Sequence, residues 1–511
     1  MPVKPVALTV FILLFVLVTG LGFWAARWRR GDLNLINEWG LAGGRFGTLV
    51  SWFLIGGDLY TAYTFIAVPG LIFGVGALGF FAVPYTTILY PMMFVIMPRM
   101  WTVARRHGYI TASDFVRGRF DSPTLALALA VAVTGILATM PYIALQMFGI
   151  EVSIAQMGVP VEASLIIAFL ILAAFTYISG LRAPALIAIV KDLLLWITVI
   201  VAIIYIPIKL GGFGKIFAAV QAAPKHPTLV LAPTQYSSYA TLALASAAAL
   251  LLYPHVITGV FSTNSRAVVK RNAALLPAYS FMLGIIALLG YMAVAAHVTP
   301  MPAYGANGAV PALITAMFPE WFAGFAFAAI SIGALVPASI MSIAAASLFS
   351  RNIWKQYVHP NCGTKEESDV AKITSLVVKV GALLFILLIA PTYAIDFQLL
   401  GGVWILQTLP AVILGLYTRW FHRWAMLAGW AAGMIYGTAL AVSNHFSSVY
   451  PFTIGGKPFP LYAAFAALIV NLIVSTGLTF VFKAMKLTNG NDETTAADFQ
   501  DSEPARVGSV A

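Results

Sequence analysis

The chain has 511 residues, of which 61% are hydrophobic and only 9% are charged, and its mean hydropathy is +0.91. A soluble protein usually carries about 25% charged residues, so this composition indicates an all-α polytopic membrane protein. The net charge of +11 lies in short loops between apolar runs, which is typical of topology signals and not of nucleic-acid binding. A single cysteine, Cys362, excludes a disulfide framework and a thiolate metal cluster.

Thirteen apolar segments reach the length of about 20 residues that a membrane-spanning helix needs. Placing the N-terminus outside puts most of the 29 Lys and Arg residues inside, which favours an N-out, C-in topology. The first segment ends in Arg27-Trp28-Arg29-Arg30 without a small-residue cleavage site, so it is interpreted as a retained helix and not as a signal peptide. The predicted spans are 6–26, 46–70, 75–98, 123–149, 162–180, 183–208, 239–262, 274–298, 320–349, 370–391, 396–417, 424–443 and 460–482.

These spans divide the chain into six predicted parts. They are a first peripheral helix with its cytoplasmic loop (1–45), spans 2–6 (46–208), an outer loop (209–238), spans 7–11 (239–417), peripheral spans 12 and 13 (418–487) and a disordered cytoplasmic tail (488–511). The tail is assigned as disordered because it is polar and acidic. The two long outer loops, 209–238 and 299–319, could each carry a short surface helix or an extracellular gate.

The second span holds a lone carboxylate, Asp58, which lies between Gly56-Gly57 and Pro69-Gly70. An ionised Asp in hydrocarbon costs several kcal/mol unless it faces protein or water. The glycines allow the helix to unwind, and unwound backbone at membrane depth survives only where it lines a cavity. This pattern predicts the ion and substrate site of a secondary transporter. The alternative is a kinked packing helix whose Asp58 reaches an interface or is protonated.

Two pairs of polar residues follow in the fourth and sixth spans. Tyr142 and Gln146 are four residues apart and share a helix face, where they could bind a polar solute or bond to a neighbouring helix. Lys191 and Asp192 are adjacent, so they point about 100° apart and are not expected to face each other. Each needs its own partner or a water-filled cavity, which suits the inner end of an ion pathway. Alternatively, both reach back to the inner interface.

The seventh and ninth spans contain prolines beside polar residues. In Tyr253-Pro254-His255, proline frees a carbonyl group and predicts a second broken helix, while His255 either titrates near neutral pH or packs. Ser339 and Ser342 share a helix face and supply hydroxyl oxygens of the type that sodium prefers. Small residues at this spacing also allow close helix packing.

The eleventh span offers Trp404 and Gln407, which could share a substrate cavity, although aromatic residues also form interfacial belts. Elsewhere the sequence has no P-loop, nucleophile elbow, His-Glu-x-x-His motif or Gly-rich dinucleotide loop. The chain is therefore predicted not to be an enzyme, to use no cofactor and to bind neither nucleotide nor nucleic acid. The driving energy must then come from an ion gradient.

At these residues the chain resembles the sodium:solute symporter family, and within it the bacterial monocarboxylate permeases. The resemblance covers roughly residues 5–485. The closest stretches are Gly56 to Pro69, Pro141 to Gln146, Ser179 to Ala188 and Leu252 to Gly259. The resemblance implies a LeuT-like core of two inverted five-helix repeats, 46–208 and 239–417, with the substrate at the midplane between broken spans 2 and 7.

The same resemblance implies a sodium site made by backbone carbonyls of span 2 and hydroxyls of span 9. The carbonyls would be those of Gly56 and Leu59, beside Asp58, and Asp192 matches the aspartate of the family's Thr-Asp motif. Lys191 replaces the threonine of that motif, and the family's Ser/Thr pair in span 9 is missing. A lysine ammonium could take the cation's place, so both Na+ and H+ remain open as the coupling ion.

We therefore expect a symporter of a bacterial inner membrane that imports short-chain monocarboxylates by alternating access. One alternative is a symporter for a neutral amino acid, a proline-like solute or a vitamin, and another is a membrane sensor or receptor. The expected ion-binding residues are Gly56, Asp58, Leu59, Lys191, Asp192, Ser339 and Ser342. The expected substrate-binding residues are Thr61, Tyr142, Gln146, Tyr253, His255, Trp404 and Gln407.

Overall fold

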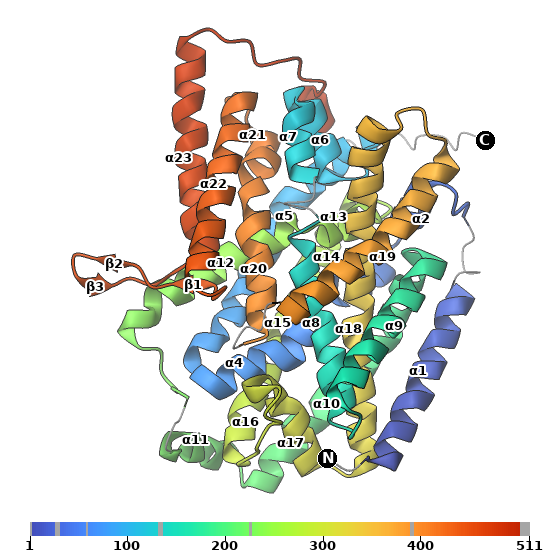
Figure 1. Cartoon of the computed structure of the whole chain (residues 1–511), viewed down its shortest axis with the longest axis vertical. Helices are drawn as coiled ribbons and strands as arrows, with labels where there is room; N and C mark the ends of the chain where they lie inside the picture. The colour runs from blue at the N-terminus through green and yellow to red at the C-terminus, as the bar shows by residue number, and fades with distance from the viewer. Residues whose placement is uncertain are drawn as a thin grey trace.

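The computed structural model describes residues 3–25, 31–57, 60–130, 136–223, 227–388 and 393–500. These residues form a bundle of helices, as expected for an all-α membrane protein (Figure 1). In the first half of the chain the α-helices are α1 (Pro5–Ala25), α2 (Ile36–Leu41), α3 (Thr48–Gly57), α4 (Val68–Val75), α5 (Ala82–His107), α6 (Ala112–Phe120), α7 (Pro123–Ala130), α8 (Thr139–Ala155), α9 (Val161–Ser179), α10 (Arg182–Leu210) and α11 (Phe213–Ala222).

The second half continues in the same way. Its α-helices are α12 (Tyr236–Leu252), α13 (Pro254–Phe261), α14 (Arg266–Leu275), α15 (Pro277–Ala287), α16 (Leu289–Ala295), α17 (Ala309–Met317), α18 (Glu320–Phe349), α19 (Thr364–Leu388), α20 (Ile395–Ile405), α21 (Gly415–Tyr417), α22 (Arg423–Ser443) and α23 (Ala463–Ala484). Short 3-10 helices are η1 (Ala42–Gly44), η3 (Ala77–Phe81), η4 (Pro233–Gln235), η5 (Gly305–Gly308), η7 (Leu406–Thr408) and η9 (Ala496–Phe499). Turns of π-helix are η2 (Tyr63–Ala67), η6 (Ser350–Val358) and η8 (Pro410–Leu414).

Among the described residues, eight helices are long and apolar enough to cross a membrane, and two bent pairs bring the number to ten. The other three predicted spans fall on shorter or interrupted helices, namely α3 with η2 and α4, α7 with α8, and α9. The count of thirteen spans, the topology and the inverted repeats stay predictions.

The predicted break at Pro254 is present. The helix from Pro233 to Leu252 and α13 meet at 53°, and a second bend of 41° precedes Pro410. Proline removes a backbone N–H and clashes with the preceding turn, which accounts for both bends. In span 2 the chain leaves α3 at Gly57 and re-enters a π turn at Tyr63.

Helix α18 is the central element of the bundle. Its apolar stretch is wholly buried, and it packs against α1, α8, α10 and α19 (Figure 1). It is rich in Ala, Gly and Ser, whose small side chains allow helix backbones to approach closely. At Gly324, for example, an added Cβ would lie 2.2 Å from the carbonyl oxygen of Ala7 in α1.

The two outer loops carry helices, which was one of the expected alternatives. Helix α11 lies in 209–238, and η5 and α17 lie in 299–319. Between α22 and α23, β1 (Val449–Tyr450) pairs with β4 (Leu461–Tyr462), and β2 (Thr453–Ile454) pairs with β3 (Lys457–Pro458), both antiparallel. The hairpin turns at Gly455-Gly456, whose positive φ angles of 58° and 74° suit glycine.

The expectation of a disordered tail from residue 488 is corrected for residues 488–500. This segment crosses from α23 to α6, at the end of the bundle opposite the N-terminus (Figure 1). Asp492 contacts Arg119 and lies 2.9 Å from Arg419 Nε, and Asp498 lies 3.1 Å from His107 Nε2. Polar and charged side chains from distant parts of the chain thus hold a segment that its composition alone indicates to be disordered. Residues 501–511 lie outside the described residues.

Candidate functional site

The break in span 2 is occupied by the side chain of Lys191, which reaches it from α10. The Lys191 ammonium donates hydrogen bonds to the carbonyl of Gly57 and, at 2.9 Å, to the carbonyl of Tyr60. Lys191 is fully buried. At Gly57 an added Cβ would lie only 3.0 Å from Lys191 Nζ, so glycine makes this close approach possible. The ammonium therefore lies in direct contact with both carbonyl oxygens of the break.

Lys191 and Asp192 contact each other, which corrects the expectation that they do not face each other. Lys191 Nζ lies 3.2 Å from Asp192 Oδ1, and the hydroxyl of Tyr279 donates to Asp192 Oδ2 at 2.5 Å. The four-carbon stem of lysine is long enough to turn back toward its neighbour, which the 100° spacing of the Cα–Cβ bonds does not take into account. Tyr279 of α15, which also lies against Gly56, carried no signal in the sequence beyond being an aromatic residue in a span.

The other predicted ion-site residues are less closely connected. Asp58 and Leu59 lie outside the described residues. Thr61, which was predicted to bind substrate, accepts at Oγ1 a hydrogen bond from the backbone N–H of Tyr63, within the break itself. Ser339 and Ser342 donate to the carbonyls of Leu335 and Ala338, one turn back in α18, as small polar residues in packed helices often do.

A second buried site lies where α8, η2, α13 and α20 meet. The ring centroid of Tyr142 lies 5.5 Å from that of Tyr253 and 5.6 Å from that of His255. The hydroxyl of Tyr253 donates to the backbone carbonyl of Gln398 at 3.1 Å. From the same face of α8 as Tyr142, Gln146 accepts the N–H of Ala62 at 3.0 Å, which ties α8 to the break in span 2. Four of the predicted substrate residues are thus brought together.

Several polar groups of this second site have no hydrogen-bond partner among the described residues. They are Gln146 Nε2, the hydroxyl of Tyr63, both ring nitrogens of His255 and both side-chain amide atoms of Gln398. All four residues are buried. We call these four side chains the polar cluster. Sequence reasoning missed Tyr63 and Gln398; the signal that could have found Gln398 is an amide near the start of an apolar span.

Trp404 and Gln407 point elsewhere, which corrects the expectation that they share the substrate cavity. Trp404 Nε1 donates to Thr438 Oγ1 of α22 at 3.1 Å. The side-chain amide of Gln407 donates to Val403 at 3.0 Å, and Gln407 accepts from Asn471 of α23 at 3.3 Å. Polar side chains of this kind join helices in a membrane, and these two join α20 and η7 to the peripheral pair.

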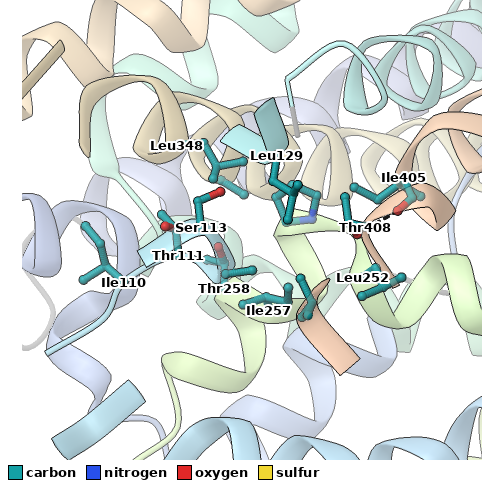
Figure 2. A pocket seen from close by; sticks show the side chains of 14 residues that line it. Ile110, Thr111, Ser113, Leu129, Leu252, Ile257, Thr258, Leu348, Ile405 and Thr408 are labelled. Carbon is teal, nitrogen blue, oxygen red and sulfur yellow. Dashed lines mark hydrogen bonds between the residues drawn. The ribbon is translucent and has the colours of Figure 1, made fainter. Parts of the chain in front are cut away.

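A cavity begins at Pro254, next to His255 in the chain, and extends toward α6. In Figure 2, Thr111 and Ser113 lie on one side of it and Ile405 and Thr408 on the other. The lining residues are Ile110, Thr111, Ala112, Ser113, Leu129, Leu252, Pro254, Ile257, Thr258, Ala344, Leu348, Ile405, Thr408 and Val412. The cavity therefore leads from the second break toward the arginine-rich end, which carries Arg106, Arg119 and Arg419.

At the opposite end the segment around η5 packs against three spans. Tyr304 donates to Glu151 of α8 at 3.0 Å, and Asn307 accepts the N–H of Ala394 at 2.8 Å. An added Cβ on Gly70 of α4 would lie 3.1 Å from the carbonyl oxygen of Ala306. These contacts close the bundle on the side where the N-terminus lies. Glu151, a buried carboxyl group in α8 just past the predicted span 123–149, was also missed by sequence reasoning.

The chain was compared with known families and proteins. A model of the sodium:solute symporter family matches residues 39–437. The monocarboxylate transport permease protein of Rhizobium johnstonii is 52% identical over 473 residues, covering 92% of this chain and 95% of that protein. The uncharacterized symporter YodF of Bacillus subtilis is 33% identical over 450 residues, covering 87% of this chain and 89% of that one.

Among solved structures, the chain is similar to a Na+-coupled sialic acid symporter in its substrate-bound outward-open state. The TM-score is 0.73, and the match covers 93% of this chain and 98% of that one. The identity is 18%, so this likeness shows a shared LeuT-like fold and nothing about the solute.

Proposed function

Because the chain belongs to the sodium:solute symporter family, we propose that it imports short-chain monocarboxylates, such as lactate, pyruvate or acetate, together with a cation. It is a multi-pass membrane transporter and not an enzyme. The proposed location is the inner membrane of a bacterium, and the proposed mechanism is alternating access around a midplane site.

The observation that carries the proposed substrate is the polar cluster. A carboxylate only accepts hydrogen bonds, and Gln146, His255, Gln398 and Tyr63 offer buried donors without partners. Each unpaired buried polar group costs about 1–3 kcal/mol, so an anion that accepts from them offsets this cost. The rings of Tyr142 and Tyr253 supply apolar walls for a short acyl chain.

The hydrogen-bonding groups of the polar cluster favour a monocarboxylate over an amino acid. An amino acid would bring an ammonium group that needs an acceptor, and the four side chains of the cluster include no carboxylate. The 52% identical relative is named a monocarboxylate permease, which supports the same solute class.

The cavity of Figure 2 supports an alternating-access mechanism. It extends from Pro254 toward the arginine-rich end, while hydrogen bonds of Tyr304 and Asn307 join helices at the opposite end. Since Arg-rich loops face the cytoplasm, we propose that this is an inward-facing state.

The test is uptake of labelled lactate into proteoliposomes, with a proton gradient and a sodium gradient imposed separately. We expect uptake that a cation gradient accelerates and that unlabelled pyruvate and acetate inhibit. Uptake inhibited by proline or a neutral amino acid, and not by pyruvate or acetate, would replace the proposed solute class. Absence of lactate uptake under both gradients would contradict the proposal.

A further inference from the structure

The break in span 2 gathers the oxygen atoms of a cation site around a nitrogen atom of the protein itself. The Lys191 ammonium donates to the carbonyls of Gly57 and Tyr60, one on either side of the break. Unwound backbone carbonyls of this kind coordinate Na+ or H+ in secondary transporters. Here they accept hydrogen bonds from lysine.

Asp192 completes the set of oxygen atoms around the same nitrogen. Its Oδ1 lies 3.2 Å from Lys191 Nζ, and its Oδ2 is held by the hydroxyl of Tyr279 at 2.5 Å. Two carbonyl oxygens and one carboxylate oxygen therefore converge on the ammonium. Lys191 and Asp192 are both fully buried, so little solvent screens this arrangement.

The space around the ammonium leaves no room for a second cation on the same oxygens. An added Cβ at Gly57 would already lie 3.0 Å from Lys191 Nζ and 3.1 Å from Cε. A sodium ion on the Gly57 and Tyr60 carbonyls would also meet the like charge of the ammonium at contact distance, where repulsion in a buried site is strong.

We propose that the Lys191 ammonium is a covalently attached cation that takes the place of sodium at this break. This inference rests on the proposed cation-coupled symport. It identifies the Lys191 ammonium as the feature of the cation site that is specific to this chain. An attached ammonium cannot leave with the substrate. A sodium gradient therefore does no work through this position, and substrate exchange requires no sodium.

The first experiment uses the wild-type protein in proteoliposomes without any gradient. Exchange of labelled for unlabelled lactate is measured while N-methylglucamine is replaced by sodium at constant ionic strength. We expect the exchange rate to be unchanged by sodium. A wild-type exchange rate that rises with sodium concentration overturns the inference, whatever the behaviour of any variant.

The second experiment compares two variants of buried lysines. Lys191→Ala removes the ammonium and leaves the carbonyls of Gly57 and Tyr60 and the carboxylate of Asp192 without it. We expect sodium to stimulate lactate exchange by this variant about 5- to 150-fold, the usual range of coupling between two ligands. The matched control is Lys379→Met in α19, where the lysine is equally buried but donates to the carbonyl of Ser375. Sodium should not stimulate the control. Equal stimulation of both variants contradicts the inference.

A measurement that needs no substrate separates this inference from the proposed function. Sodium that binds the folded protein raises its melting temperature. We expect no sodium-dependent rise for the wild type and a rise for Lys191→Ala. If lactate exchange is absent in every medium but this pattern holds, the solute class fails and the inference stands. A sodium-dependent rise in the wild type overturns the inference even if lactate is transported.

Discussion

At the scale of single residues, the proposed function depends on buried polar groups that have no hydrogen-bond partner among the described residues. Gln146 is the clearest case, because its oxygen is fixed by the N–H of Ala62 while its Nε2 is free to donate. The hydrogen bond to the side-chain oxygen therefore holds the amide so that its nitrogen can donate to a ligand.

Replacing Gln146 by methionine should weaken lactate binding about 10- to 100-fold, because a hydrogen bond to a charged group contributes about 1.5–3 kcal/mol. The measurement is the lactate concentration that half-saturates exchange. The control is Gln407→Met, which removes an amide that bonds to Val403 and Asn471. This variant should leave half-saturation unchanged. A larger effect at Gln407 than at Gln146 would mean that the substrate site is misplaced.

The Lys191–Asp192 pair makes a separate prediction about stability. Asp192→Asn leaves a buried ammonium without its carboxylate and should cost about 3–5 kcal/mol. Tyr279→Phe keeps both charges and removes one hydrogen bond, so it should cost about 1.5–3 kcal/mol. Thermal unfolding of the purified proteins in detergent gives the order of the two. If Asp192→Asn is as stable as Tyr279→Phe, the charges are not held as described.

At the scale of elements, the contacts of residues 488–500 tie the chain end to α6, which lines the cavity. The backbone N–H of Glu493 donates to the carbonyl of Gly118 at 2.9 Å, and Arg99 lies over the ring of Phe499 at 4.6 Å. Because Thr111, the N-cap of α6, lines the cavity, this segment restrains one wall of the cavity.

The docking of residues 488–500 on the bundle should depend on pH. Burial opposes ionisation of Asp498, but hydrogen bonds from the Thr495 backbone and from His107 outweigh it and lower the pKa of this carboxyl. A lowered pKa stabilises docking above the ordinary aspartate range, and the gain is lost as pH falls through the folded pKa. A spin label at residue 500 should be immobile at neutral pH and become mobile below about pH 4.

The control for this measurement is Asp498→Asn, which removes the titrating group. Its label should show a much smaller change in mobility between neutral and acid pH. A wild-type label that is equally mobile at both pH values would contradict the docking seen here.

At the scale of the whole molecule, the cavity lies toward the arginine-rich end of the bundle, which we propose faces the cytoplasm. Thr258 lines that cavity, whereas Ser331 in α18 is fully buried and does not. With Cys362, the one cysteine of the chain, replaced by serine, a cysteine can be placed at either position.

Thr258→Cys should react with a membrane-impermeant maleimide in inside-out vesicles and much more slowly in right-side-out vesicles. Ser331→Cys should react in neither. Labelling of Thr258→Cys from the outer side alone would reverse the proposed orientation of the bundle.

The sequence by itself determined the class of molecule and the positions of two of its breaks, in spans 2 and 7. Long apolar runs with few charges exclude a water-soluble fold, since about 20 apolar residues match the bilayer core. The break at Pro254 follows from local chemistry, because proline lacks the N–H that continues a helix.

Only the tertiary structure decided which polar residues meet. Trp404 and Gln407 turn to α22 and α23, whereas Gln398, two turns earlier, faces Tyr253. Helical spacing states which residues share a face, but the neighbouring helices determine what that face contacts. In the same way, the acidic segment 488–500 is ordered by arginines far away in the chain. The Lys191 ammonium is in the break of span 2 because a flexible side chain can cross from one helix to another, which no spacing within a single helix records.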